Sequence, residues 1–442
     1  MTMKSVLALS LSIFLFLLNS PVQTANKALT ETEIQIVSSI DKSHAQSLSL
    51  LEKVVNINSG TMNFAGVKKV GDVFTKEFNA LDCKTQWIDG KSVGRAGHLF
   101  ATCGSKNANF KGTKLLLIGH LDTVFASNSE FQSFKAIDDK TVAGPGIVDM
   151  KGGDVIIIAA LKALKSNGAL DQLQIKVIMT GDEEKRGSPY EVATQELVDA
   201  GKWADIALAF ENGDSDPKTA VVSRRGSTRW QLNVVGRPAH SSQIFRDSYG
   251  YGSIFEAARI LNEFRTQLST QENLTFNPGV IVGGTDVEYD SSLTRGSAFG
   301  KNNVISQSTI VSGDIRALSP KQLTDAQADM QKIVAQNLTK TSATLTFFSG
   351  YPPMSPNEGN HRLLSLYSKA SIDLGFGEVT AVDPRKAGAA DVSFVASHVD
   401  MALDGLGLMG SGGHTIKEVA DISTLSSQTK RAAILMYRLS KL

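Results

Sequence analysis

KLLLIGHLDTV (114–124), DVIIIAALKAL (154–164) and LQIKVIMT (173–180) follow one another in the chain and read as a strand, a helix and a strand. The outer two runs are short and apolar enough for buried strands, and the middle run has the length of a helix. YEVATQELVDAG (190–201) and ADIALAF (204–210) continue the alternation. Alternating strands and helices predict an α/β fold with a mostly parallel sheet.

The pattern changes near Ser223. From residue 228 we expect a strand (228–236), a helix (251–268), strands at 279–284 and 303–318, a helix (320–338) and a strand (342–348). This β-α-β-β-α-β order is ferredoxin-like and forms a compact α+β unit by itself. After the Pro/Gly/Ser/Asn-rich linker 349–360 the first pattern resumes. We therefore expect a catalytic domain at 26–223 and 350–442, interrupted by an inserted domain at 224–349.

The N-terminus has the pattern of a signal peptide. Lys4 precedes an apolar run at residues 6–18, which polar and small residues follow as far as Ala25. The run is shorter than the roughly 20 residues that span a bilayer, and no later segment reaches that length. We expect residues 1–25 to be removed and the mature protein to be exported, either to a periplasm or to the medium.

Composition excludes several classes of protein. With 45 Lys+Arg against 44 Asp+Glu, the formal charge is +1, which argues against nucleic-acid binding. Cys83 and Cys103 are the two cysteines, too few for a disulfide scaffold or a cysteine-ligated zinc module. They occur in strand-like runs on either side of GKSVGRAG (90–97), so either a disulfide or two buried thiols fits an exported protein.

Residues capable of chemistry follow the predicted strands or lie in glycine-rich loops. Open α/β sheets place their sites at the carboxyl ends of strands. Any one of these motifs by itself would be an ordinary turn or capped residue, and their joint occurrence in order carries the argument. They are His120 and Asp122, Asp149 in GPGIVDMKGG (144–153), Glu183 and Glu184 in GDEE, Glu211, and His414 in LGLMGSGGHTIKE (406–418).

Imidazoles and carboxylates without a thiolate form a ligand set that suits zinc, with cobalt or manganese as substitutes. One bridging carboxylate can hold two ions that share a hydroxide. Asp122, two residues after His120, can accept the other ring N–H and so orient the imidazole. Of the adjacent glutamates, one can bind metal while its neighbour acts as a base.

Together these motifs resemble the co-catalytic dizinc peptidases and deacylases, the family of glutamate carboxypeptidase, aminoacylase, peptidase T and succinyl-diaminopimelate desuccinylase. The resemblance covers essentially the whole mature chain and implies a phosphorylase/hydrolase-like catalytic domain with two zinc ions per chain. It implies that His120 and Glu211 bind one ion, that Glu184 and His414 bind the other, and that Asp149 bridges both. Glu183 would be the general base, Asp122 would orient His120, and a cis peptide would follow Asp149.

The resemblance also makes the inserted domain a lid through which the chain forms a homodimer. His240 in GRPAHSS (236–242) would stabilise the oxyanion in the partner's active site, and Asn303 and Arg316 would hold the substrate carboxylate. Two positions depart from the family pattern. Tyr351 stands where glutamate-releasing carboxypeptidases have a basic residue, and Ala390 replaces a threonine beside the retained Asp391.

These features predict a zinc-dependent enzyme that hydrolyses a peptide bond in carboxypeptidase fashion, by a metal-bridged hydroxide with Glu183 as base. A deacylase of N-acyl amino acids would use the same residues and is the alternative within enzymes. An exported protein that captures peptides or metal without turnover is the alternative from another class. Glu183 argues against that alternative, because a binding protein needs no base beside a metal ligand.

Overall fold

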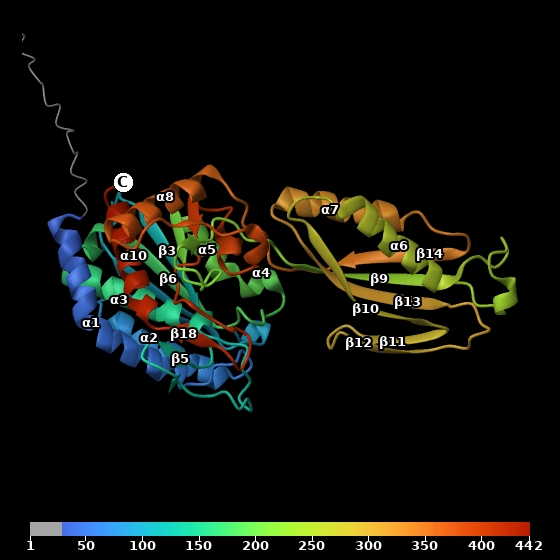
Figure 1. Ribbon diagram of the computed structural model, residues 1–442, viewed down its shortest axis with the longest axis horizontal. Coiled ribbons are helices and arrows are strands. Elements are labelled where there is room, and N and C mark those ends of the chain that lie inside the picture. The colour runs from blue at the N-terminus through green and yellow to red at the C-terminus, as the bar shows by residue number, and fades with distance from the viewer. Residues whose placement is uncertain (1–28) are drawn as a thin grey trace, which may run out of the picture.

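The computed structural model describes residues 29–442, so the expected signal peptide lies outside the described residues. The molecule is elongated and has two parts, joined where the chain passes from one to the other and back (Figure 1). We call residues 228–347 the inserted unit and the other described residues the main unit. No helix among the described residues is both long and apolar enough to cross a membrane.

A six-stranded mixed sheet forms the centre of the main unit, in the order β1-β2-β6-β3-β7-β16. Its last four strands are parallel, and β1 and β2 form an antiparallel hairpin at one edge. The expected α/β fold with a mostly parallel sheet is confirmed. The strands are β1 (Lys84–Asp89), β2 (Gly97–Gly104), β3 (Lys114–His120), β6 (Gln174–Thr180), β7 (Ile206–Ala209) and β16 (Met401–Leu403).

Helices cover both faces of this sheet. Successive residues of a strand point to opposite faces, so an apolar strand makes both faces apolar. Leu115 and Leu117 of β3 belong to one apolar cluster, and Leu116 and Ile118 belong to the other. The larger cluster includes residues of α1 (Glu31–Val55), α2 (Phe64–Asn79), α3 (Gly152–Ser166), α8 (Glu358–Asp373) and α10 (Ser423–Leu439). The smaller includes residues of α5 (Gln195–Trp203) and α9 (Val392–Val395), and the short α4 (Tyr190–Ala193) precedes α5.

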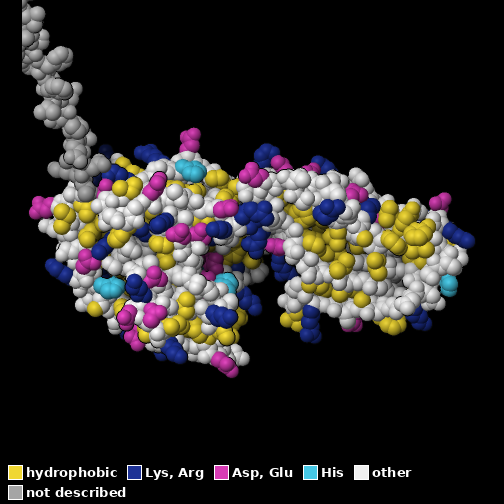
Figure 2. All heavy atoms as spheres, viewed as in Figure 1, with side chains coloured by type: hydrophobic (Ala, Val, Ile, Leu, Met, Phe, Trp, Pro, Cys, Tyr) yellow, Lys and Arg dark blue, Asp and Glu magenta, His cyan; other side chains and the backbone are white. Residues whose placement is uncertain are grey.

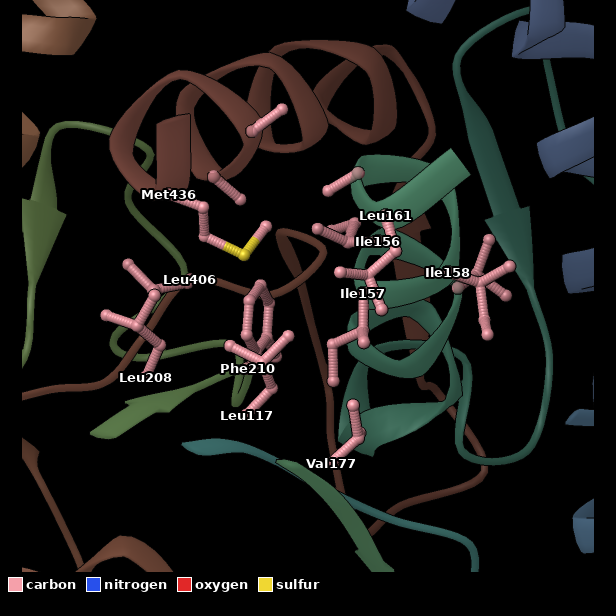
Figure 3. Packing of buried hydrophobic residues seen from close by; sticks show 14 of the residues in the cluster. Leu117, Ile156, Ile157, Ile158, Leu161, Val177, Leu208, Phe210, Leu406 and Met436 are labelled. Atoms are coloured by element: carbon pink, nitrogen blue, oxygen red, sulfur yellow. The ribbon is translucent and has the colours of Figure 1, made fainter. Parts of the chain in front are cut away.

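Helix α3 is buried on all sides from Gly152 to Leu161, and apart from Asp154 this stretch is apolar. Ile156, Ile157 and Leu161 point toward the strands and toward α10, and Phe210 lies among them (Figure 3). Burial of each such side chain stabilises the fold by roughly 1.5–3 kcal/mol. The core therefore fixes the N-terminal end of α3, which is where the turn containing Asp149 ends.

Short strands complete the main unit. A four-stranded antiparallel sheet in the order β17-β18-β5-β4 joins the C-terminal loop to residues before α3, and β8 and β15 form a parallel pair. Their bounds are β4 (Lys135–Ala136), β5 (Thr141–Ala143), β8 (Thr219–Ala220), β15 (Thr380–Ala381), β17 (Gly410–Ser411) and β18 (Val419–Asp421).

The inserted unit has its own antiparallel sheet, in the order β10-β13-β9-β14, with α6 and α7 on one face (Figure 1). A separate apolar cluster around Trp230, Leu232 and Phe264 lies between the sheet and these helices. The elements are β9 (Thr228–Gly236), α6 (Gly252–Leu268), β10 (Thr275–Gly284), β13 (Ser308–Arg316), α7 (Pro320–Val334) and β14 (Thr341–Phe347).

One local expectation was incomplete. A hairpin of β11 (Asp286–Asp290) and β12 (Arg295–Phe299) lies between β10 and β13, where no strand was expected. Its strands are half-buried or exposed, so they lack the apolar run by which strands are recognised. The first helix begins at Glu31, where Thr30 and Glu33 form a capping box.

Cys83 and Cys103 form a disulfide between the hairpin strands β1 and β2. This settles the choice that the sequence leaves open between a bridge and two buried thiols. Cys83 immediately precedes β1 and Cys103 lies in β2, so the bridge ties the open end of the hairpin.

Candidate metal centre

The structure brings the candidate residues to one edge of the main sheet. His120 is the last residue of β3, and Glu183 and Glu184 follow β6. Glu211 follows β7. These residues come together because the carboxyl ends of parallel strands meet at the same edge of a sheet. Figure 2 shows acidic side chains and a histidine together in a hollow of the main unit that faces the inserted unit.

Two further residues reach this edge from loops. Asp149 lies in the turn before α3, and the peptide bond that follows it is cis, which confirms that expectation. His414 lies between β17 and β18 with a φ of 63°, in the left-handed region that few non-glycine residues adopt. Such backbone conformations occur preferentially where a side chain is held for function.

Asp149 lies between two histidine–glutamate pairs. Its Oδ1 is 3.1 Å from Nε2 of His120, and the same nitrogen is 3.4 Å from Oε1 of Glu211. Its Oδ2 is 3.0 Å from Nε2 of His414, which is 3.2 Å from Oε2 of Glu184. The two oxygens of one carboxylate thus face two separate groups of nitrogen and oxygen donors.

These separations fit metal ligation. Two atoms that are each about 2.1 Å from a tetrahedral zinc ion lie about 3.4 Å apart. One ligand atom each of His120, Asp149 and Glu184 lies within 4.8 Å of the others. Oε1 of Glu184 is buried and has no hydrogen-bond partner, so it lacks the interaction that a cation would provide. The residues present therefore fit a divalent metal.

The pKa values of the histidines and of Glu184 are shifted because these groups lie close together in a buried place. Burial opposes the charged form of His120, but Glu211, Asp122 and Asp149 outweigh burial and raise its pKa well above the usual value. Hydrogen bonds to Asp149 and Glu184 raise the pKa of His414 to about 11. Burial raises the pKa of Glu184 to about 7, although the hydrogen bond to His414 opposes that shift.

The pKa of Glu183 is also raised. Burial is the main cause that raises it well above the usual value, and the negative charges of Asp391, Glu211 and Glu184 act in the same direction. A carboxyl group held in this way accepts and donates a proton more readily near neutral pH than an exposed glutamate does.

Three buried carboxylates outside the expected metal-ligand set hold the loops that carry it. Asp122 accepts the backbone N–H groups of Glu183 and Glu184 at 3.1 and 3.2 Å. Asp404 accepts the N–H of Glu211 at 3.2 Å. Glu418 accepts N–H groups from the turn containing Asp149, those of Gly146 and Val148 at 2.9 Å and that of Asp149 itself at 3.3 Å.

The expected role of Asp122 is only part of what it does. Nδ1 of His120 is 3.0 Å from the backbone oxygen of Asp122 and 3.5 Å from its Oδ1, so the main chain is the nearer partner. Sequence reasoning missed Asp404 and Glu418, since each lies near a motif but contacts residues far away in the chain. Glu418 ends the quoted loop 406–418, and its acidic side chain there was the available signal.

The three residues expected in the lid are not part of this cluster. Arg316 ends β13 beside the main unit, close to Gly388, and pairs with Asp314 at 3.0 Å. His240 and Asn303 lie beyond the opposite end of the inserted sheet, where the N–H of Ser241 donates to the oxygen of Asn303 at 2.9 Å. His240 is exposed, and its Nδ1 is 2.8 Å from Oγ of Ser242.

Comparison with known proteins identifies this arrangement. A model of the peptidase family M20/M25/M40 matches residues 116–438, most of the chain. The chain belongs to this family. It is therefore a hydrolase of a metallopeptidase family, and the family resemblance drawn from its motifs is confirmed.

Individual relatives agree with this membership. Carboxypeptidase G2 of Pseudomonas sp. (strain RS-16) is 26% identical over 400 residues, which cover 88% of each chain. Succinyl-diaminopimelate desuccinylase of Rickettsia prowazekii (strain Madrid E) is 27% identical over 260 residues, 55% of this chain and 64% of that protein. The aminopeptidase PepT of Bacillus cereus ATCC 10987 superposes with a TM-score of 0.71 at 19% identity over 90% of this chain and 98% of that one, which shows a shared fold.

Proposed function

We propose that this M20/M25/M40 peptidase is a zinc-dependent hydrolase that cleaves a peptide bond in carboxypeptidase fashion. The observation that carries the proposal is the position of Asp149, with one oxygen toward His120 and Glu211 and the other toward His414 and Glu184. The similarity to carboxypeptidase G2 over 88% of both chains supports the direction of cleavage.

In this proposal each half of the centre holds one of two zinc ions, with His120 and Glu211 on one and Glu184 and His414 on the other. Asp149 serves both, and cobalt or manganese can substitute for zinc. A zinc pair supplies Lewis-acid polarisation of the scissile carbonyl and lowers the pKa of the attacking water. Glu183 takes the proton from that water and delivers it to the leaving amine. Burial that raises the pKa of Glu183 suits both steps.

We further propose that residues 224–349 are a lid and dimerisation domain on a catalytic domain formed by 26–223 and 350–442. Strand β9 has nine residues, so it extends about 30 Å from the junction with the main unit. His240 lies beyond its far end, which favours a role for His240 in the active site of a partner subunit. We propose that Arg316, at the near end, binds a substrate carboxylate in its own chain and that Asn303, at the far end, does so in the partner's site.

Export is the remaining part of the proposal. The pattern of residues 1–25 and the Cys83–Cys103 disulfide both favour an oxidising compartment outside the cytosol. The alternative of an N-acyl amino acid deacylase is favoured by one observation, the match to succinyl-diaminopimelate desuccinylase. The non-catalytic alternative is not supported, because the chain belongs to a family of peptidases.

The test is product analysis on matched libraries of dipeptides and N-acyl amino acids, with purified protein supplied with zinc. Release of C-terminal amino acids from dipeptides supports the proposal, and cleavage confined to N-acyl substrates would favour deacylation. Glu183→Gln should retain about two zinc ions per chain and lose roughly a hundredfold or more in kcat, because Glu183 moves protons without binding metal. Loss of metal in Glu183→Gln would show that the roles of Glu183 and Glu184 are exchanged.

A further inference from the structure

The two chain segments that connect the units run side by side as a short antiparallel ribbon. Residues 223–227 lead out to β9 and residues 348–354 return from β14. Arg224 and Met354 exchange backbone hydrogen bonds at 2.9 Å, and Ser227 and Tyr351 do so at 2.9 and 3.0 Å. We call these two segments the junction ribbon. The ribbon is the covalent connection between the two units, so the inserted unit can turn against the main unit only if the ribbon bends or twists.

One side chain of the ribbon reaches the turn that carries Glu183. The hydroxyl of Tyr351 donates to the backbone oxygen of Glu183 at 2.7 Å, and it accepts from Nη2 of Arg186 at 3.0 Å. The ring lies against Phe394 and Tyr190, with centroids 4.9 and 6.2 Å away. The hydroxyl is therefore held in place both by its partners and by the packing of the ring.

Arg186 fixes the other side of this contact. Its guanidinium is buried between the carboxylates of Asp182 and Asp391 and donates to both. Asp391 also accepts from Oγ1 of Thr180 at 2.5 Å, and Asp182 accepts the N–H of Gly187 at 3.0 Å. A buried cation with two such partners is held in one position, because a lost partner would leave a charge unpaired in the interior. Tyr351 thus joins the ribbon to a rigid part of the main unit.

Two independent groups then hold the backbone on either side of Glu183. Its N–H is accepted by Asp122, a residue of the main sheet edge, at 3.1 Å. Its carbonyl oxygen is bound by Tyr351 of the ribbon at 2.7 Å. The direction of the side chain depends on both peptide groups, because the Cα–Cβ bond turns with them. The peptide group that follows Glu183 is held at both ends, because its N–H, which is that of Glu184, is accepted by Asp122 at 3.2 Å. Loss of the Tyr351 hydroxyl leaves this group held at one end only, so the direction of the Glu183 side chain is less well fixed.

From these contacts we propose that Tyr351 is a positioning residue for the general base, and that through it the placement of Glu183 depends on the ribbon that carries the inserted unit. The proposal rests on the proposed function, in which Glu183 is the base. It assigns a role to a tyrosine whose hydroxyl binds the main chain beside the metal centre.

The test is Tyr351→Phe, which removes the hydroxyl and keeps the ring. We expect kcat to fall about tenfold, as for the loss of one well-placed hydrogen bond, with KM within about twofold of the wild type. Zinc content and the midpoint of thermal unfolding should be unchanged. Tyr367→Phe is the matched control, since Tyr367 is a buried tyrosine of α8 whose hydroxyl lies 3.5 Å from Gln428, and it should leave kcat unchanged.

A double-mutant comparison separates positioning from a merely structural role. If Tyr351 acts through Glu183, Tyr351→Phe should cause no further loss in a Glu183→Gln chain. The same tenfold loss in both backgrounds, a kcat unchanged in the single variant, or loss of zinc would each overturn the proposal. Failure of the proposed function itself would be seen separately, as wild-type turnover in Glu183→Gln or as absence of bound metal in the unmodified chain.

Discussion

Most of the contacts that shape the metal centre are made by side chains to main-chain groups. Glu183, Glu184, Glu211 and Asp149 each have a backbone N–H bound by a buried carboxylate, and the carbonyl of Glu183 is bound by Tyr351. A ligand is only as well placed as the backbone that carries it, so residues around the centre affect metal affinity without touching metal.

Glu418→Gln tests this dependence. Glu418 accepts N–H groups with both of its oxygens, and a glutamine would place an NH₂ group against one of those donors. We expect zinc affinity to fall about 10- to 100-fold, as is typical for residues that support a ligand. Competition with a chromogenic chelator would measure this. Glu256→Gln is the control, because Glu256 is an equally buried glutamate that accepts the N–H of Leu338 in the inserted unit. Equal affinities in the two variants would contradict the expected role of Glu418.

Metal uptake should release protons. The pKa of His414 is raised to about 11 by Asp149 and Glu184, so in the metal-free protein this imidazole is protonated at neutral pH. Burial raises the pKa of Glu184 to about 7, so Glu184 is protonated below pH 7 and ionised above it.

A ligand must lose its proton before it binds metal, so the apparent zinc affinity should rise with pH. The rise should be steeper at pH 6, where Glu184 also gives up a proton, than at pH 8. Calorimetry in buffers of different ionisation enthalpy counts the protons, and equal release at both values would be evidence against these assignments.

Helices and strands hold the loops of the metal centre in place by their packing in the core. The N-terminal end of α3 follows the turn containing Asp149, and the apolar faces of α3 hold that turn in the core (Figure 3). The β1–β2 hairpin instead lies at the sheet edge, where β2 pairs directly with β6, and the disulfide ties its open end.

Removal of this disulfide should reduce stability and leave catalysis intact. The bridge closes a loop between residues 20 apart, and a loop of that size stabilises the fold by about 3 kcal/mol through the entropy of the unfolded chain. The double variant Cys83→Ala/Cys103→Ala should therefore unfold at a lower urea concentration than the parent chain. Its zinc content and kcat should equal those of the parent chain. A loss of zinc at temperatures where the variant is folded would mean that the hairpin also supports the metal centre.

The inserted unit extends away from the main unit, so its far end forms one end of the elongated molecule (Figure 1). Exposed apolar side chains occur on this unit, including Val235, Ile254 and Phe255. Pairing of two inserted units about a two-fold axis would cover such side chains and bring the far end of each to the partner's centre.

Subunit complementation tests the dimer. His240→Ala should lower kcat by roughly a hundredfold, as for other oxyanion donors, with little change in KM. A mixture with Glu183→Gln chains should regain roughly a quarter of the full activity, because half of the dimers are mixed and each has one intact site. Mixing His240→Ala with a chain that carries both substitutions is the control and should restore nothing. If subunits exchange and activity does not return, His240 acts within its own chain or is structural.

The sequence alone determined the alternation of strands and helices, and it identified the acidic and histidine residues at the strand ends. Both signals are local, since hydrophobic periodicity and the position of a residue after a strand can be read from a few neighbours. It also contains the capping box of Thr30 and Glu33, which begins α1.

Only the tertiary structure decided which of these residues face one another. Asp149 meets His120 and His414 from separate parts of the chain, and Asp404 and Glu418 hold turns that lie 193 and about 270 residues away in sequence. A short window of sequence likewise could not predict the hairpin at 286–299, the disulfide or the distance of His240 from the main unit. The physical reason is the same in each case: long-range contacts arise from packing of the whole chain, and no short window of sequence contains both partners.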